Sequence, residues 1–401
     1  MTLAHPADPH VSRKSPASGA PRVVYLDNNA TTQALPEVRD AVAQALDGEF
    51  GNPSSAHSTG ERARRSLFEA RQAVANLVGA EPEQVIFTSG ATEANNIVLM
   101  SAALWDGPGG ILTTSIEHSS VLKCCEHLEA QGIPVTYLSP TAGGLVDPES
   151  LKAAVTDLQP RLVAIQWVNN ETGVIQPIER IADICRRHGM ALLCDGAQAV
   201  GKLPMAFGET DIDFLTFTGH KFHGPPGVGA LVARDTRGLR PLLHGGDQEG
   251  GLRPGTENFP GIVGLGVAAR ARYDRLTAVR SAIGSMRNQF EAALLERFPF
   301  IRVNGDVNQR VFNTTNLCFQ GLDGQALVAR FDAHDVRCSQ SSACTNSRPE
   351  PSYVLRAMGL SENDAYASIR FAFSELNTPE DPDLAVERIS QSVETLAAIL
   401  A

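Results

Sequence analysis

The feature that most constrains the fold is an alternation of short apolar segments with amphipathic helical segments between about residues 36 and 217. Hydrophobic residues three or four positions apart mark the helical segments. Parallel strands need crossover connections of this kind, and the helices then cover both faces of the sheet. The expected strands are 84–88, 111–115, 135–138, 162–168, 191–194 and 214–217, and the expected helices are 36–46, 61–78, 91–105, 119–131, 148–158 and 178–188. The pattern therefore predicts an α/β fold with a mostly parallel sheet covered by helices.

The pattern changes after residues 253–255 (RPG). A long helical periodicity over 262–297 is expected to lead into a smaller α+β unit, with strands at 311–319 and 367–373 and helices at 325–333, 351–358 and 379–400. We therefore expect a large domain at 36–264 and a small C-terminal domain at 265–401. Residues 1–20 are expected to be a disordered tail, and residues 21–35 an N-terminal segment that packs with the small domain.

Composition excludes several classes of function. The chain has 401 residues, and 34 Lys and Arg against 45 Asp and Glu give a net charge of −11. That balance, without a basic run, argues against direct binding of nucleic acid. No apolar run is long enough to span a bilayer, and the N-terminus lacks the apolar core of a secretory signal. The 7 cysteines include no C-x-x-C pair. They indicate a reducing compartment, so we expect a cytoplasmic protein without a disulfide framework.

Two motifs at predicted strand ends could bind a ligand. Residues 88–93 (TSGATE) lie where a strand ends and a helix begins, and the free N–H groups of such a turn attract an anion. A plain helix cap is the alternative. Residues 194–198 (CDGAQ) place Asp195 at the carboxyl edge of the sheet, where open α/β folds bind ligands. The alternative is an aspartate that caps the next helix.

Two further motifs carry nucleophiles. In residues 218–229 (TGHKFHGPPGVG), Lys221 follows an apolar strand, and a buried lysine can act as an amine nucleophile. The alternative is a surface lysine in a glycine turn, and a phosphate-binding P-loop is disfavoured because the G-K-[ST] ending is missing. Residues 338–347 (CSQSSACTNS) form a polar, turn-prone loop, in which Cys344 could act as a thiolate. The other cysteines are expected to be buried and inert.

Together, these motifs resemble the pyridoxal-phosphate enzymes of aminotransferase class V, and most closely the cysteine desulfurases of the NifS/IscS type. The resemblance extends from Tyr25 to about Glu375. The matching stretches are 25–32 (YLDNNATT), 51–55 (GNPSS), 88–93 (TSGATE), 117–118 (EH), 168–171 (VNNE), 195–198 (DGAQ), 219–221 (GHK), 253–256 (RPGT), 342–344 (SAC) and 368–370 (SIR). It implies fold type I of the pyridoxal-phosphate transferases and pyridoxal 5'-phosphate as cofactor.

The resemblance also implies a role for each matching residue. Lys221 is expected to bind the cofactor as a Schiff base, and Asp195 to pair with its pyridine nitrogen. Gln198 is expected to bond the ring oxygen, and His118 to stack on the ring and to be a candidate for proton transfer. The expected substrate-carboxylate clamp is Asn170 and Arg370. The expected phosphate ligands are Ala91, Thr92, Thr218, His220 and Thr256, the last of them from the other subunit of a homodimer. No metal ligand is expected.

The reaction implied by the resemblance converts L-cysteine to L-alanine. The Cys344 thiolate would take the substrate sulfur as a persulfide and pass it to an acceptor protein, in iron–sulfur cluster assembly or a thiolation pathway. Transamination needs no such cysteine, so Cys344 separates a desulfurase from a plain aminotransferase. The loop departs from the family's common Ser-Ser-Gly-Ser-Ala-Cys, but it matches the long-loop group. Selenocysteine lyase, another class V aminotransferase and a catalytically silent partner-binding subunit are the alternatives.

Overall fold

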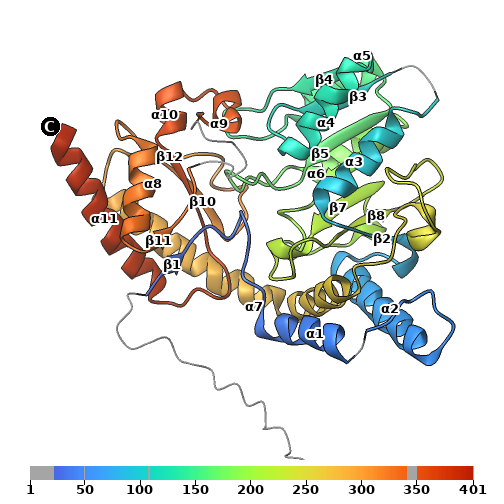
Figure 1. Ribbon diagram of the computed structural model, residues 1–401. Coiled ribbons are helices and arrows are strands. Elements are labelled where there is room, and N and C mark those ends of the chain that lie inside the picture. The colour runs from blue at the N-terminus through green and yellow to red at the C-terminus, as the bar shows by residue number, and fades with distance from the viewer. Residues whose placement is uncertain (1–21, 49, 107–108, 341–349, 401) are drawn as a thin grey trace, which may run out of the picture.

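The protein is organised around two sheets with separate hydrophobic cores (Figure 1). The computed structural model describes residues 22–48, 50–106, 109–340 and 350–400. In the view of Figure 1, the larger sheet and its helices occupy the right half of the molecule. The smaller sheet lies in the left half, together with α8 and α11. The long helix α7 (Phe259–Arg297) runs along the base of both and contacts α1, α2 and α11.

The larger sheet has seven strands in the order β2-β8-β7-β6-β5-β3-β4. All neighbours among β3 to β7 pair in parallel, whereas β8 is antiparallel to both β2 and β7. The strands are β2 (Val85–Thr88), β3 (Ile111–Thr114), β4 (Val135–Leu138), β5 (Leu162–Gln166), β6 (Ala191–Asp195), β7 (Phe214–Thr218) and β8 (Gly229–Ala233). The prediction of a mostly parallel α/β sheet is confirmed. The prediction missed β8, because it follows directly on a run of Gly and Pro.

The helices of this part include three whose first turn is capped by a side chain, that of His57, His118 or Asp147. They are α1 (Pro36–Asp47), α2 (Ser58–Val78), α3 (Ala91–Ala102), α4 (Ser119–Ala130), α5 (Pro148–Leu158) and α6 (Ile178–Arg187). The Asp147 carboxylate accepts the backbone N–H groups of Glu149 and Ser150 at the start of α5. Helix α3 is shorter than the predicted 91–105, because the N–H groups of Leu104 and Trp105 bond three residues back in a tighter turn.

The smaller sheet is antiparallel, with the order β12-β10-β9. Its strands are β9 (Ile301–Val303), β10 (Thr314–Phe319) and β12 (Ser368–Ala372), and its helices are α8 (Gly324–Ala333), α9 (Tyr353–Ala357), α10 (Glu362–Tyr366) and α11 (Asp381–Leu400). Aromatic rings fill its core, where Phe290 lies 5.0 Å from Phe371 and 5.4 Å from Phe373 between ring centroids. The short strand β1 (Val24–Tyr25) pairs in parallel with β11 (Val336–Arg337), which fixes the N-terminal segment to this unit.

Gly229 lies where β8 packs closely against the backbone of neighbouring segments. It pairs with Thr88 on β2 and Thr218 on β7. A Cβ atom there would lie 2.3 Å from the carbonyl oxygen of Phe217 and 2.7 Å from the Cα of Gly90. We expect Gly229→Ala to lower the free energy of unfolding by about 1–3 kcal/mol through overpacking, measured as a lower thermal midpoint. Gly48→Ala is the control, because its Cβ would meet only the Gln44 carbonyl at 4.0 Å. Equal midpoints for the two variants would contradict the close packing.

Candidate active site

Polar residues from five strands gather at one edge of the larger sheet. Strands β2, β3, β5, β6 and β7 run in the same direction and all end there. Each strand is followed by one of the motifs singled out in the sequence, at 88–93, 117–118, 168–171, 195–198 and 219–221. The carboxyl edge of a parallel sheet is where such folds bind ligands. The predicted residues on the larger sheet are therefore brought together by its topology.

Lys221 ends the turn η3 (Gly219–Lys221) that directly follows β7. Its Nζ donates to the carbonyl oxygens of Asn29 at 2.7 Å and Ala30 at 2.8 Å. The side chain is half-buried, so the alternative of a surface lysine in a glycine turn does not describe it. The N-terminal segment that follows β1 thus crosses to the larger sheet and provides acceptors for the amine.

Asp195 ends β6 and is buried. Its Oδ1 accepts the backbone N–H of Ala197 at 2.9 Å, and its Oδ2 accepts the side-chain Nδ2 of Asn95 at 2.9 Å. Residues 197–202 form turns, so Asp195 does not cap a helix. Two fixed donors therefore set the orientation of a carboxylate at the centre of the sheet edge.

A second lysine lies beside this site. The Lys202 Nζ donates to Asn29 Oδ1 at 2.9 Å and also to Gln198 Oε1, while Gln198 Nε2 donates to the Asn29 carbonyl at 2.9 Å. Burial lowers the pKa of Lys202 well below its ordinary value, and the positive charge of Lys221 adds to this effect. Sequence reasoning found Gln198 but missed Lys202 and Asn29. The sequence signal for Lys202 and Asn29 is weak, because their side chains meet only in the folded chain.

His118 is the N-cap of α4. Its Nδ1 accepts the backbone N–H of Ser120 at 3.1 Å and lies 2.8 Å from Ser120 Oγ. Burial lowers the pKa of His118, partly offset by the negative charge of Asp195. The neighbouring Glu117 is fully buried, and burial raises its pKa to about 8 although its Oε1 accepts the Thr114 hydroxyl at 2.6 Å.

Arg370 reaches the site from β12 of the smaller sheet. Its Nη2 bonds Asp27 Oδ1 at 2.7 Å, and its Nη1 donates to the Asn170 carbonyl at 3.1 Å. The guanidinium is buried, with 2% of the side chain exposed. The structure thus brings Arg370 and Asn170 together, as the resemblance implied. Sequence reasoning missed Asp27 as the carboxylate that pairs with Arg370.

Two of the predicted phosphate residues lie in the first turn of α3. Ala91 and Thr92 begin the helix after Gly90, and the buried Thr218 lies near enough that a Cβ on Gly90 would be 3.4 Å from its Oγ1. His220 Nδ1 lies 3.1 Å from Thr31 Oγ1, and burial lowers the pKa of His220 to about 4. Thr256 is exposed, on a segment that Arg253 attaches to Glu93 at 3.0 Å. The turn can therefore receive an anion.

This set of groups fits pyridoxal phosphate. An amine, a buried carboxylate, an imidazole and a helix N-terminus lie at one sheet edge, matching the aldehyde, pyridine nitrogen, ring face and phosphate of the cofactor. Cys344 lies outside the described residues. Among the described cysteines, five are buried, and Cys338 is half-buried with its pKa raised by burial.

Two negative findings apply to the described part of the chain. It contains no group of three or more His, Cys, Asp or Glu side chains arranged to hold a metal ion. Its helices include none with the length and apolar character needed to cross a membrane.

The raised pKa of Glu117 predicts a pH dependence of stability. Between the ordinary glutamate pKa and about 8, the folded protein holds a proton that the unfolded chain releases. Stability contributed by this neutral carboxyl is present at lower pH and is lost as the pH rises through that window. Glu117→Gln cannot titrate, so its advantage over the wild type should grow by on the order of 4 kcal/mol from about pH 5 to about pH 9.

Thermal midpoints of Glu117→Gln and wild type across this pH range provide the measurement. Glu61→Gln, at an exposed position of α2, is the matched control and should follow the wild type at every pH. A constant difference between Glu117→Gln and wild type would contradict a neutral buried Glu117.

Known proteins match this chain over nearly its whole length. The family model "Aminotransferase class-V" matches residues 24–384. A cysteine desulfurase of Trichormus azollae is 42% identical over 378 residues, covering 94% of each chain. A solved NifS-like protein superposes with a TM-score of 0.87 at 32% identity, covering 94% of this chain and 100% of its own. SspA in complex with cysteine superposes with a TM-score of 0.77 at 35% identity, covering 88% and 100%. The chain therefore belongs to the class-V aminotransferase family, whose enzymes depend on pyridoxal phosphate.

Proposed function

We propose that this protein is a pyridoxal-phosphate-dependent cysteine desulfurase, which converts L-cysteine to L-alanine and passes the sulfur to an acceptor protein. The observation that carries the proposal is the meeting of Lys221 and Asp195 on the larger sheet with Arg370 from the smaller one. Relatives that cover 94% of the chain carry the name cysteine desulfurase, and SspA was solved with cysteine bound.

When bound, pyridoxal phosphate supplies an aldehyde that reacts with amines and a ring that withdraws electrons from the substrate Cα. Lys221 would hold the aldehyde, and Asp195 would keep the pyridine nitrogen protonated. His118 would cover the ring, and Gln198 would donate to the ring oxygen. The phosphate would lie at the first turn of α3, with Ala91, Thr92, Thr218 and His220 as its ligands.

The substrate carboxylate would bind between the two sheets. Arg370 offers a buried guanidinium, and a planar fork of this kind suits a carboxylate. Gln166 Nε2 donates to Asn170 Oδ1 at 3.2 Å, so the Asn170 amide nitrogen faces away from Gln166 and would be the group that donates to the carboxylate. Asp27 already holds one side of Arg370 at 2.7 Å, so the guanidinium is fixed before a substrate arrives. The position of the carboxylate then sets the position of the substrate Cα.

The proton of the substrate Cα needs a base, and Lys221 is the amine placed for it. Its Nζ donates to two backbone carbonyls, which keep the side chain at the carboxyl edge of the sheet. The same amine can return the proton to carbon when L-alanine forms. Lys221 therefore serves as both anchor and base in this proposal.

Cys344 is the proposed sulfur acceptor within the chain. Its thiolate would attack the substrate sulfur, forming a sulfur–sulfur bond while the substrate carbon–sulfur bond breaks and its electron pair remains on carbon. Described residues on both sides of residues 341–349 attach to the site. Ser339 bonds the backbone of Arg370, and Tyr353 donates to the Glu117 carbonyl at 2.6 Å. These attachments support a sulfur transfer at this site.

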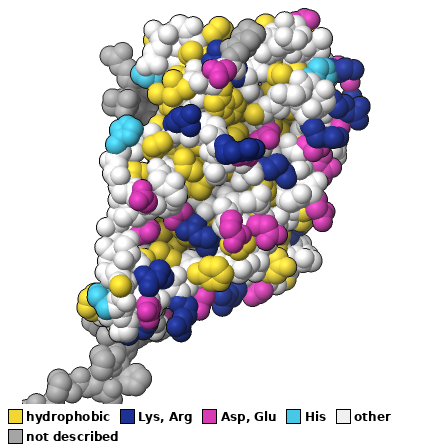
Figure 2. All heavy atoms as spheres, turned by 90° about the vertical axis from the view of Figure 1, so that its right-hand side faces the viewer, with side chains coloured by type: hydrophobic (Ala, Val, Ile, Leu, Met, Phe, Trp, Pro, Cys, Tyr) yellow, Lys and Arg dark blue, Asp and Glu magenta, His cyan; other side chains and the backbone are white. Residues whose placement is uncertain are grey.

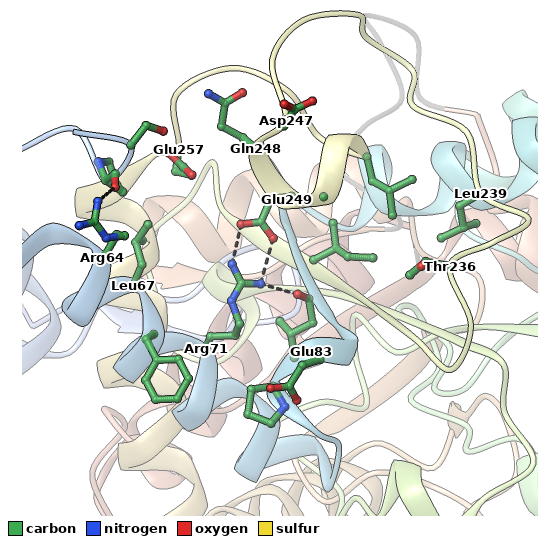
Figure 3. A pocket seen from close by; sticks show the side chains of 18 residues that line it. Arg64, Leu67, Arg71, Glu83, Thr236, Leu239, Asp247, Gln248, Glu249 and Glu257 are labelled. Carbon is green, nitrogen blue, oxygen red and sulfur yellow. Dashed lines mark hydrogen bonds and ion pairs between the residues drawn. The ribbon is translucent and has the colours of Figure 1, made fainter. Parts of the chain in front are cut away.

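We further propose a homodimer in which Thr256 completes the phosphate site of the partner. Thr256 is exposed beside a cavity of about 1250 Å³ that Phe68, Arg71 and Glu249 line (Figure 3). Figure 3 shows Arg71 of α2 pointing to Glu249. The two side chains form a 2.6 Å ion pair, which attaches the segment around Glu249 to α2. Phe68 is 56% exposed and Leu243 58% exposed. Figure 2 shows hydrophobic side chains between charged ones across one face of the molecule. A second copy would cover such surface.

A cytoplasmic location and the identity of the sulfur acceptor are also proposals. The six described cysteines are free, as expected in a reducing compartment. An acceptor would have to present its own thiol to the Cys344 persulfide, because a persulfide passes its outer sulfur to a nucleophilic thiolate. An iron–sulfur scaffold or a sulfur carrier for thiolation has this chemistry.

Replacing Cys344 tests the sulfur-transfer step. We expect Cys344→Ser to bind the cofactor as the wild type does, seen as the same yellow colour, but to lose sulfide release from L-cysteine in the presence of a thiol reductant. Cys338→Ser is the matched control and should keep sulfide release. Mass spectrometry of the wild type after incubation with L-cysteine should show one added sulfur on the peptide that contains Cys344. Full sulfide release by Cys344→Ser would contradict the role of Cys344 as sulfur acceptor. A wild type that releases selenium from L-selenocysteine but no sulfur from L-cysteine would favour a selenocysteine lyase.

Mixed dimers test the origin of Thr256. Lys221→Ala and Thr256→Asp should each be inactive alone, because the first lacks the amine and the second repels the phosphate. If Thr256 serves the partner, a mixed dimer contains one site with both intact residues, so mixing the two inactive proteins under exchange conditions should restore activity. Thr256 acting within its own subunit predicts no restoration. Light scattering on the wild type checks the dimer itself.

A further inference from the structure

A buried side chain connects the carboxylate of the site to its imidazole. Asn95 lies on α3, about one turn after the helix begins, and is 0% exposed. Its Nδ2 donates to Asp195 Oδ2 at 2.9 Å and to Ser120 Oγ at 3.0 Å. Its Oδ1 accepts the hydroxyl of Thr216 on β7 at 2.6 Å. Asn95 therefore contacts β6, β7 and α4 from one position.

The chemistry of these partners fixes the orientation of the amide. A carboxylate only accepts, so the nitrogen of Asn95 must face Asp195. The Thr216 hydroxyl then donates to the amide oxygen. The second N–H of Asn95 goes to the Ser120 oxygen, and Ser120 must direct its own hydroxyl hydrogen elsewhere.

The nearest acceptor for that hydrogen is His118 Nδ1, at 2.8 Å from Ser120 Oγ. The same nitrogen accepts the backbone N–H of Ser120 at 3.1 Å, and a backbone N–H can only donate. Two donors thus point at Nδ1. The proton of a neutral His118 ring must be on Nε2, and a proton on Nδ1 would break both hydrogen bonds.

We propose that Asn95 and Ser120 are positioning residues that hold His118 as the neutral tautomer protonated on Nε2. At neutral pH, His118 then donates a hydrogen bond through Nε2, while the two donors occupy the lone pair of its Nδ1, which leaves Lys221 as the base. The tautomer depends on this chain alone, whereas its consequence for catalysis rests on the proposed function.

Three titratable groups surround His118. Asp195 on β6 favours a positive charge on the ring, and Lys221 after β7 opposes it. Glu117 precedes it in the chain and is held neutral by burial up to about pH 8. The hydrogen bonds at Nδ1 add to burial and work against protonation of the ring. Their removal should therefore be visible in the titration of His118.

Nitrogen NMR on the full-length protein measures the tautomer directly. Protein labelled with ¹⁵N-histidine would be examined with its cofactor bound and after removal of the cofactor, and His118→Asn would identify the His118 signals among the 10 histidines. We expect a protonated Nε2 and an unprotonated Nδ1 at neutral pH in both forms. A protonated Nδ1, in either a neutral or a cationic ring, would overturn the proposal. This outcome is independent of whether the enzyme desulfurates cysteine.

Variants test the two positioning residues. Ser120→Ala keeps the backbone donor but removes the hydroxyl, so the His118 titration midpoint should rise by about one pH unit. Asn95→Leu should raise the His118 titration midpoint by less, because the Ser120 hydroxyl can still donate to Nδ1. Asn96→Leu is the matched control on the next position of α3, where the amide donates to the Thr92 carbonyl at 2.8 Å and to the Ser120 backbone carbonyl at 3.5 Å but not to the Ser120 hydroxyl, and it should leave the midpoint unchanged. An unchanged midpoint in Ser120→Ala, or equal midpoints for Asn95→Leu and Asn96→Leu, would contradict these roles.

Discussion

The buried carboxylate of Asp195 constrains the rest of the site. A buried charge is tolerated only where fixed donors meet it. The backbone of Ala197 provides one donor, and Asn95 provides the other from α3. The same helix begins at the turn that can receive a phosphate, so one rigid element sets both the carboxylate and the anion site. The distance between these two groups is therefore determined by the packing of α3 on the sheet, and a ligand with an anionic end and a basic ring nitrogen matches it.

The second constraint comes from the N-terminal segment, which joins the two sheets. Asn29 accepts hydrogen bonds from Lys221, Gln198 and Lys202 of the larger unit. Its Nδ2 donates to Thr314 on β10 at 2.9 Å. Asp27, two residues earlier, holds Arg370 of β12. The amine that would carry the cofactor and the guanidinium that would hold the substrate are thus oriented by the same short stretch of chain. A shift of one sheet relative to the other would disturb both at once.

Much of the fold could be read from the sequence, because local periodicity and strand-end motifs are local signals. The α/β sheet, the long helix α7 and the order of the site motifs all appear in it. The sequence did not predict strand β8, because a Gly-Pro run precedes it. It also did not predict the two-residue pairing of β1 with β11, because that pairing depends on contacts more than 300 positions apart. Asn95, Lys202 and Asp27 were missed for a related reason. Each is an ordinary polar residue in the sequence, and only the folded chain shows that its partners are Asp195, Gln198 and Arg370.

The most direct test of the central claim is to find the lysine that carries the cofactor. Borohydride reduction of the purified protein, followed by peptide mass spectrometry, fixes the cofactor on the amine that holds it. We expect the mass of reduced pyridoxal phosphate on the peptide that contains Lys221, whose Nζ lies at the sheet edge beside Asn29 and Ala30. Cofactor on Lys202, the buried lysine next to it, or on neither peptide would contradict the assignment of the whole site.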